Sequence, residues 1–359
     1  MPILLTGASG FLGTKLVAHL CSSGETHLRC FVRPNSDTSK LDGLRAKYPS
    51  TRFEYVVGNL LSRDDAYRAT HDVDMVYHLA AQMRGAAPSL YENAVVASRN
   101  LLEGVIAHRV RRVVLVSSIS VYGLSHLRRR VVITETQPLD PHPEQRDCYT
   151  FAKVRQDLLF QEYRRQNDFE LIVLRPGAIY GESRHLLPSR AALRLGPVLL
   201  QIAAHNPIPV VYVDNCVAAL ALAGSQTFPE GCYNVVDDNL PTGQEYVQAF
   251  RSVADNVHCM KLSVPLAILL SHLLDRYRSY SKGRIPRLLT PYQVRATWGG
   301  HTFSNHKLKG AGWRPLVSTS DAMLCTFKGS KSEIQLAAAK ESSRTYIAGH
   351  PSRLVKSEN

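Results

Sequence analysis

The stretch that decides the fold is residues 6–13, Thr-Gly-Ala-Ser-Gly-Phe-Leu-Gly, which directly follows the apolar run at residues 2–5. After it, Leu16, Val17 and Leu20 recur at the spacing of one helical face. We therefore expect a strand, a glycine-rich turn and an amphipathic helix in immediate succession. In that context the backbone of the turn and the free N–H groups of the helix N-terminus can bind the phosphates of a dinucleotide.

Each glycine of this turn has its own expected role. Gly7 permits the tight turn, Gly10 lets the backbone approach a pyrophosphate, and Gly13 lets the helix pack closely on the strand. The residues of the turn that we expect to contact a dinucleotide are Gly7, Ser9, Gly10, Phe11, Leu12 and Gly13.

A second pattern lies far downstream, where Tyr149 is the only one of the 16 tyrosines with a lysine four residues later, at Lys153. Residues i and i+4 share a face of a helix, so the ammonium group can lie near the phenol. A nearby positive charge favours the phenolate and lowers the pKa of the phenol. Beside a bound dinucleotide, such a phenol is suited to move a proton while a hydride is transferred.

The first half of the chain alternates short β-rich runs with longer helical patterns. Expected strands span residues 3–5, 28–32, 53–57, 75–79, 113–117 and 171–174. Expected helices span residues 11–21, 90–108 and 149–165. This alternation predicts an α/β fold, a Rossmann-type doubly wound parallel sheet with a smaller C-terminal substrate lobe. Functional groups should then gather at the carboxyl ends of the strands.

We expect the chain to divide into three parts. Residues 1–175 form a Rossmann domain that binds the dinucleotide and also receives about residues 210–236, while residues 176–327 form the substrate-binding lobe. Residues 328–359 are polar and rich in small side chains, which is typical of a flexible tail. Within the second lobe, residues 242–245 (Thr-Gly-Gln-Glu) have the spacing of a capping box and predict the start of a helix.

Composition limits the classes of function. The 359 residues are 45% hydrophobic and 20% charged, with a formal net charge of +13. Basic residues are dispersed, and their short clusters do not interleave with aromatic residues, so we expect no nucleic-acid partner. The seven scattered cysteines include no CxxC pair, which argues against a disulfide framework and a zinc site. We expect no metal, no signal peptide and a cytoplasmic location.

The longest apolar run spans residues 262–274 (LSVPLAILLSHLL). It falls short of the ~20 residues that a helix needs to span a bilayer. One interpretation is a helix of the core. The other is a helix that makes a peripheral contact with a membrane surface.

The second expected strand leads into Arg33, with no carboxylate in its last residues. Proteins that prefer NAD usually present an acid to the adenosine ribose there, whereas an arginine suits the 2′-phosphate of NADP. We therefore favour NADP as the cofactor. NAD stays possible, because Asp37 is a competing ligand for the ribose.

Further motifs follow the glycine turn in a fixed order. They are residues 77–81 (YHLAA), 116–123 (VSSISVYG), 174–177 (LRPG) and 211–215 (VYVDN). Together with Tyr149 and Lys153, they resemble the extended short-chain dehydrogenase/reductase superfamily, often called the NAD-dependent epimerases/dehydratases. The resemblance runs from residue 2 to about residue 322, and it implies an enzyme that uses NAD(P) to act on a small-molecule substrate.

The resemblance also implies roles for individual residues. Ser118 would hydrogen-bond the reacting oxygen, with Ser117 and Ser120 as alternatives. Tyr149 would be the general acid/base, and Lys153 would lower its pKa and hold the nicotinamide ribose. The further residues that the resemblance places against the cofactor are Asn59, Leu60, Leu79, Ala80, Ala81 and Pro176.

Two positions depart from the family pattern. Asn59 stands where relatives usually carry an acid that touches the adenine, and we expect a changed contact without loss of binding. The asparagine of the relatives' proton relay should fall at Ala94, whereas this chain has Asn93 one position earlier. Such a slip rotates a helical side chain by about 100°. We therefore expect a different relay or a different start of the helix.

The substrate motifs divide between two branches of the superfamily. Ile208 stands where nucleotide-sugar enzymes usually carry a diphosphate-binding arginine. Residues 185–188 (HLLP) and 289–292 (LTPY) instead resemble the 3β-hydroxysteroid and sterol dehydrogenase branch. We favour hydride transfer between nicotinamide and a secondary alcohol or ketone of a sterol-like or other non-nucleotide substrate.

Two alternatives are kept. The first is a nucleotide-sugar epimerase or dehydratase, whose diphosphate clamp would come from Arg184, Arg190, Arg284 or His301. The second is a regulatory protein that binds NAD(P) without turnover, although the intact set of serine, tyrosine and lysine argues against it. By analogy with relatives, a homodimer would pair through the helices at residues 90–108 and 149–165.

Overall fold

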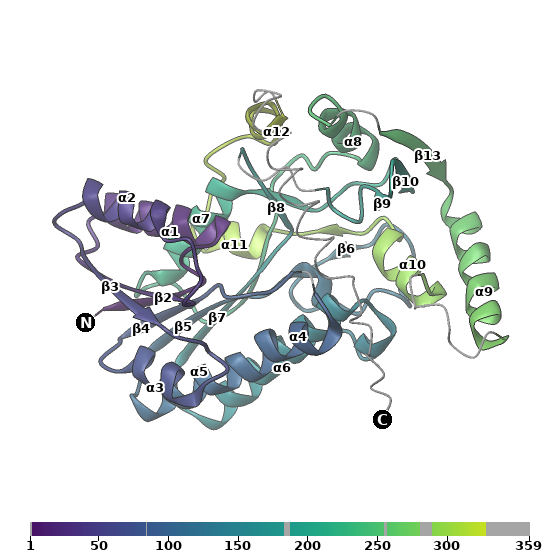
Figure 1. The fold of residues 1–359 in the computed structure, drawn as a ribbon. Coiled ribbons are helices and arrows are strands. Elements are labelled where there is room, and N and C mark those ends of the chain that lie inside the picture. The colour runs from purple at the N-terminus through teal and green to yellow at the C-terminus, as the bar shows by residue number, and fades with distance from the viewer. Residues whose placement is uncertain (1, 84, 183–186, 255–256, 281–288, 328–359) are drawn as a thin grey trace, which may run out of the picture.

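The computed structural model describes residues 2–83, 85–182, 187–254, 257–280 and 289–327. Its centre is a seven-stranded parallel sheet with the strand order β12-β7-β5-β4-β1-β2-β3 (Figure 1). The order reverses between β1 and β4, as it does in a doubly wound sheet, and the predicted fold class is confirmed. The strands are β1 (Ile3–Thr6), β2 (His27–Val32), β3 (Arg52–Val57), β4 (Met75–His78), β5 (Arg112–Val116), β7 (Glu170–Pro176) and β12 (Gly231–Val235).

Helices cover both faces of this sheet (Figure 1). One face carries α1 (Phe11–Ser22), α2 (Ser39–Lys47) and α7 (Val213–Gly224). The opposite face carries α3 (Arg63–Thr70), α4 (Ala87–Tyr91), α5 (Ala97–Ala107) and α6 (Cys148–Gln166). The central strands β4 and β5 are therefore buried on both sides, which explains why their segments of the sequence are almost continuously apolar. The edge strand β3 is partly exposed.

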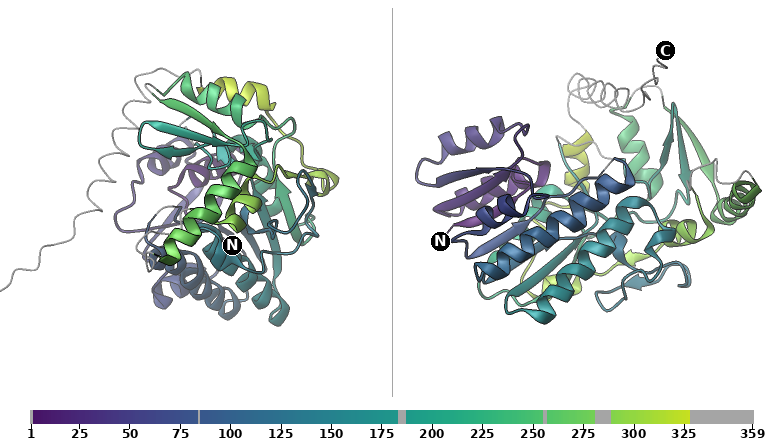
Figure 2. Two further views of the ribbon diagram at one scale, coloured as in Figure 1. Left: turned by 90° about the vertical axis from the view of Figure 1, so that its right-hand side faces the viewer. Right: turned by 60° about the horizontal axis from the view of Figure 1, so that its bottom comes forward.

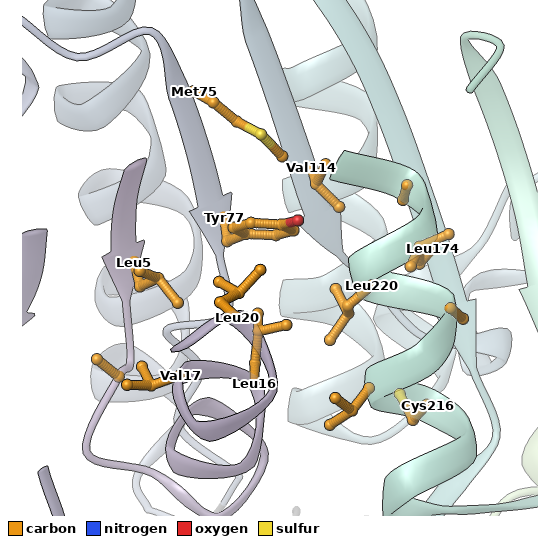
Figure 3. Close-up of a cluster of buried hydrophobic side chains, with 14 of the residues drawn as sticks. Leu5, Leu16, Val17, Leu20, Met75, Tyr77, Val114, Leu174, Cys216 and Leu220 are labelled. Atoms are coloured by element: carbon orange, nitrogen blue, oxygen red, sulfur yellow. The ribbon is translucent and has the colours of Figure 1, made fainter. Parts of the chain in front are cut away.

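The core between the sheet and its first helical layer is apolar and close-packed. Figure 3 shows Leu5, Tyr77 and Val114 on three adjacent strands, with Leu20 of α1 and Leu220 of α7 beside them. All five side chains are at most 5% exposed. Since successive residues of a strand point to opposite faces, their sequence neighbours fill the second core, under α3, α5 and α6.

The helix predicted over residues 90–108 is not one regular helix. A π-helical turn, Glu92–Val96, separates α4 from α5. A π turn closes its hydrogen bonds one residue later than an α-helix, so it holds one extra residue. The predicted helix is therefore confirmed, since the chain is helical without a break from Ala87 to Ala107, and the π turn is a local irregularity that the apolar pattern does not reveal.

The second lobe is built after β7. Strands β9 (Leu193–Leu195), β10 (Val198–Ile202) and β13 (His258–Leu262) form a three-stranded sheet. Helix α8 (Gly243–Arg251) starts with the predicted capping box of Thr242 and Glu245, which is confirmed. The remaining elements are β6 (Val132–Ile133), β8 (Ala178–Tyr180), β11 (Val210–Tyr212), β14 (Thr302–Phe303), α10 (Pro291–Trp298), α11 (His306–Gly310) and α12 (Thr319–Phe327).

The chain returns to the first lobe after β11, because α7 packs on α1 and β12 pairs with β7. The exact division into a cofactor domain and a substrate lobe stays a prediction. The predicted tail, residues 328–359, lies outside the described residues.

Helix α9 (Val264–Tyr280), which contains most of the longest apolar run, lies at the edge of the second lobe (Figures 1 and 2). Its inner face buries Val264, Ala267 and Ser271. Six large side chains on it remain 40–56% exposed: Leu266, Leu269, Leu270, Leu273, Leu274 and Tyr277. The interpretation as a core helix therefore holds for the inner face of α9 and is wrong for its outer face. Within the described residues, no helix is long and apolar enough to cross a membrane.

Candidate active site

A cavity of about 660 Å³ opens at the carboxyl ends of β1, β4, β5 and β7, between the sheet and the second lobe. It brings the glycine turn and the downstream Tyr149 and Lys153 to one place. The residues expected from the sequence that line it are Gly7, Gly10, Phe11, Leu12, Gly13, Leu79, Ala81, Ser118, Tyr149, Lys153 and Pro176. Five expected cofactor contacts lie outside this lining: Ser9, Arg33, Asn59, Leu60 and Ala80.

The glycine turn has the geometry of a phosphate-binding cradle. Gly7 adopts a positive φ of 73°, and a Cβ placed on it would lie 2.9 Å from the Ala80 nitrogen. A Cβ on Gly13 would lie only 2.2 Å from the Gly7 carbonyl oxygen. Gly10 is the N-cap of α1, and no side chain caps this helix end. The turn and the helix end therefore fit a dinucleotide, because the glycines let its phosphates approach the backbone N–H groups of the helix N-terminus.

Lys153 is held rigidly inside the cavity wall. Its side chain is buried, and its Nζ donates to the Val116 carbonyl (2.9 Å) and to Gln156 Oε1 (2.8 Å). Burial lowers the pKa of this lysine to about 8, and the charge of Asp157 opposes the shift. The ammonium group thus remains mostly protonated at neutral pH while its orientation is fixed by two acceptors.

Gln156 lies between this ammonium group and the helices below the sheet. Its Nε2 donates to Ser98 Oγ (2.8 Å) and to the Ala94 carbonyl (3.2 Å). Sequence reasoning did not single out Gln156, because a polar residue in an amphipathic helix is usually on its exposed face. The glutamine is 1% exposed and joins α6 to the π turn.

The same buried polar network continues towards the glycine turn. His78 Nε2 lies 3.0 Å from Ser98 Oγ, and His78 Nδ1 lies 2.7 Å from Thr6 Oγ1. Burial lowers the pKa of His78 to about 3, so its ring is neutral. Because Thr6 directly precedes the turn, an unbroken set of buried hydrogen bonds connects it to the lysine.

Both positions considered for the relay asparagine lie in the π turn. Asn93 donates to Gln82 Oε1 and to the Ser89 carbonyl, both at 2.9 Å. Ala94 is buried, and its carbonyl accepts from Gln156. Gln156 of α6 thus connects this turn to Lys153, and the expected difference in the relay stays a prediction.

The three candidate serines have different surroundings. Ser117 Oγ donates to Asp157 Oδ2 (2.7 Å), and Asp157 also forms a buried ion pair with Arg175. Ser117 also lines the cavity, but its hydroxyl group is engaged by this buried carboxylate. Ser118 lines the cavity, and its Oγ accepts from the Ser120 N–H (3.1 Å). Ser120 lines the cavity as well.

The residues expected near the adenosine lie at the edge of the sheet. Arg33 follows β2 and is exposed. Asn59 is exposed too, and its Oδ1 accepts from the Leu61 N–H (3.1 Å), so it shapes its own turn. Asp37 Oδ1 accepts from the Ser39 N–H (3.0 Å) at the start of α2.

The second lobe closes the cavity with apolar and polar side chains. Leu187, Leu193 and Ile208 line it, so the position expected to bear a clamping arginine is part of an apolar wall. Arg190 also lines the cavity, whereas His301 is buried outside its lining. Residues 185–186 and the proposed clamps Arg184 and Arg284 lie outside the described residues.

Arg146 is a lining residue that sequence reasoning missed. Its side chain is 2% exposed, and its Nη1 donates to Asp140 Oδ2 (2.9 Å). Tyr292, from the LTPY motif, donates to the other oxygen of Asp140 (2.5 Å). An arginine in the turn before the helix that carries Tyr149 is a weak signal, because nothing in the sequence around it indicates burial.

The chain belongs to the NAD dependent epimerase/dehydratase family, whose model matches residues 3–235. It is therefore an enzyme that depends on a nicotinamide dinucleotide, and the non-catalytic interpretation is set aside.

Among its relatives, an uncharacterised UDP-glucose epimerase of Bacillus subtilis is 26% identical over 61% of this chain and 71% of its own length. A decarboxylating sterol-4-alpha-carboxylate 3-dehydrogenase of Saccharomyces cerevisiae is 27% identical over 89% of this chain and 95% of its own length. A solved UDP-glucose 4-epimerase of Thermus thermophilus, in complex with NAD, has a TM-score of 0.65 at 20% identity and covers 93% of this chain and 99% of its own. At that identity the solved structure shows the shared fold alone.

Proposed function

We propose that this enzyme transfers a hydride between nicotinamide and a secondary alcohol or ketone of a non-nucleotide substrate. The observation that carries the proposal is a single cavity lined by Ser118, Tyr149, Lys153 and the glycine turn. A bound nicotinamide dinucleotide would supply or accept the hydride.

In this proposal the chain's own residues orient the substrate and move its proton. The Tyr149 hydroxyl gives a proton to the reacting oxygen or takes one from it. The fixed ammonium group of Lys153 favours the phenolate during this transfer. Ser118 Oγ stabilises the charge that develops on the same oxygen. The lobe that covers the cavity keeps bulk water from the transfer.

The apolar wall supports a substrate with an apolar body. Leu187, Leu193 and Ile208 leave the second lobe without an arginine at the expected clamp position. The yeast sterol dehydrogenase matches nearly the whole chain, which supports the sterol-like class. The nucleotide-sugar alternative has equal support among relatives, and Arg190 in the cavity lining favours it.

For the cofactor we propose NADP, because Arg33 follows β2 where a 2′-phosphate would need a positive charge. NAD remains the alternative.

Two surfaces carry further proposals. The exposed apolar face of α9 is proposed to contact a membrane surface, since α9 packs on α10, which lines the substrate cavity. A sterol-like substrate could then enter from the lipid.

A homodimer through the face of α5 and α6 is proposed by analogy, with Leu158 of α6 exposed on it.

The function is tested by titration with NADPH and NADH, followed by a panel of ketosteroids, hydroxysteroids, UDP-sugars and GDP-sugars. We expect tighter NADPH binding and net oxidation or reduction of a steroid. Tyr149→Phe should keep the cofactor affinity and lose at least about a hundredfold in kcat. Turnover of a nucleotide sugar without net consumption of cofactor would instead establish the epimerase alternative.

A further inference from the structure

Two arginines line the cavity beside Tyr149. Arg146 lies in the turn just before α6, three residues ahead of Tyr149, and Arg190 comes from the segment that precedes β9. The family motifs and the proposed proton transfer use neither of them. The proposed reaction therefore leaves the ligand of these two guanidinium groups unassigned.

Arg146 is fixed in place from outside the cavity. Asp140 is completely buried and accepts from Arg146 Nη1, from the His142 N–H (3.0 Å) and from Tyr292 Oη (2.5 Å). These contacts use one nitrogen of the guanidinium group. Arg146 Nε is buried and has no hydrogen-bond partner among the described residues. A buried charged group with an unpartnered donor lowers the stability of the fold, so we expect this nitrogen to find an acceptor in a bound ligand.

Arg190 is held by neutral groups only. Its Nη1 donates to the Thr297 carbonyl (2.8 Å), and its guanidinium group lies 5.7 Å from the centre of the Phe303 ring. No carboxylate among the described residues forms an ion pair with it. Burial and the charge of Arg146 lower the pKa of Arg190 to about 9, and Asp147 partly opposes this shift. The two positive charges therefore repel each other inside one cavity.

A second acid, whose charge acts on Arg190, is already engaged elsewhere. Asp147 lines the cavity but caps α6, where Oδ1 accepts from the Thr150 N–H (2.9 Å) and Oδ2 accepts from Thr150 Oγ1 (2.8 Å). Two further lining residues have buried polar atoms without a partner among the described residues, Ser120 Oγ and Trp298 Nε1. Arg146 is paired with Asp140, so the lining combines several polar atoms without a partner with one guanidinium group, that of Arg190, for which the described residues provide no ion pair.

We propose that Arg146 and Arg190 together bind an anionic group of the substrate, a carboxylate or a phosphate. Such a group would accept charge-assisted hydrogen bonds from both guanidinium groups and relieve their repulsion. Because Arg146 lies in the turn that starts the helix of Tyr149, the anionic group is placed near the reacting carbon. The apolar wall of Leu187, Leu193 and Ile208 receives the rest of the substrate.

This inference rests on the proposed function for the choice of substrate class, but its test measures binding without turnover. The probes are cholate, its uncharged methyl ester, and UDP, each titrated into the protein with oxidised NADP. Quenching of tryptophan fluorescence reports binding, because Trp298 lines the cavity and Trp313, the other tryptophan, is buried in the core under α1 and α7.

The variants are Arg190→Gln and Arg146→Lys, the latter keeping a cation for Asp140. The matched control is Arg194→Gln, an exposed arginine of β9 outside the cavity lining. We expect cholate to bind about tenfold or more tightly than its methyl ester. Arg190→Gln should reduce this preference to about threefold or less, Arg146→Lys should weaken it, and Arg194→Gln should leave it unchanged.

UDP binding that is lost in Arg190→Gln would assign the same site to a phosphate. Equal binding of cholate and its ester by the native protein, together with UDP binding that does not depend on either arginine, would overturn the proposal. If the site binds an anion while no steroid is oxidised or reduced, the proposed function fails and the anion site stands. Thermal unfolding of each variant checks that the fold is intact.

Discussion

At the residue scale, the central feature is a buried ammonium group with two fixed acceptors. Lys153 could be identified from the sequence because the four-residue spacing from Tyr149 follows directly from helix geometry. The environment of the lysine could not be predicted from the sequence. Its acceptors belong to β5 and to the next turn of α6, and burial of Gln156 depends on the packing of α6 against the π turn.

A first prediction concerns the pH dependence of stability. Because the folded protein binds the Lys153 proton less tightly than the unfolded chain, the free energy of unfolding should rise as the pH increases from about 8 to 10.5. The difference between these two pKa values corresponds to about 3 kcal/mol. Urea unfolding of the native protein and of Lys153→Met, from pH 7 to 10.5, measures this contribution as the difference between the two curves. Parallel curves would show that the lysine is not buried as described.

A second prediction concerns Gln156 as a positioning residue. Removal of its acceptor oxygen in Gln156→Leu should lower the pKa of Lys153 below about 8, because one hydrogen bond to the charged form is lost. The alkaline limb of the kcat profile should then move to lower pH, with little change in KM. Gln166→Leu, at the exposed end of the same helix, is the matched control. An unmoved alkaline limb in Gln156→Leu would mean that the glutamine serves packing alone.

At the element scale, the glycine turn could be predicted closely, whereas the π turn within the helix over residues 90–108 could not. The turn is encoded locally, since glycine at three fixed positions permits contacts that a side chain would block. The π turn depends on how α4 and α5 pack on α6, and this packing cannot be deduced from the spacing of apolar residues in the sequence. The sequence left two interpretations of α9 open for a similar reason, because a leucine-rich run looks the same whether one or two faces of its helix are covered.

A third prediction tests the turn. Gly13→Ala would place a Cβ 2.2 Å from the Gly7 carbonyl oxygen, so α1 must shift away from β1. We expect a loss of about 1–3 kcal/mol of stability and weaker cofactor binding. Gly43→Ala in α2, where nothing lies within 4 Å of the added Cβ, should instead stabilise by about 0.5–1 kcal/mol. Chemical denaturation and cofactor titration of both variants give the comparison, and equal stability of the two would contradict the described turn.

At the scale of the whole molecule, the arrangement of the lobes follows from the sheet. Parallel strands place all their carboxyl ends at one edge, and the second lobe covers that edge. The alternation of strand and helix patterns in the sequence was sufficient to predict the parallel sheet and the edge at which its strands end. The individual lining residues of the second lobe were harder to predict, because Arg146 and Trp298 reach the cavity from segments without regular spacing to the family motifs.

A fourth prediction concerns the outer surface of α9. Leu269→Glu combined with Leu273→Glu should abolish co-sedimentation with vesicles that contain anionic phosphatidylserine, because the apolar face is lost while the buried face is untouched. Leu158→Glu on α6 is the control and should leave vesicle binding intact. The molar mass from light scattering tests the alternative, in which a second copy of the chain covers the apolar face of α9. A dimer that α9 substitutions dissociate, with no vesicle binding by the native protein, would reassign this face to a second copy of the chain.

The return of β12 to the first lobe has a consequence for dividing the chain. Strand β12 pairs along β7, and α7 covers α1, although both follow the first strands of the second lobe. A fragment that ends at residue 175 would therefore expose the hydrogen-bonding edge of β7 and the apolar side of α1. Such a truncated polypeptide should aggregate, whereas a version that splices residues 210–236 back onto it should regain a closed hydrophobic interior.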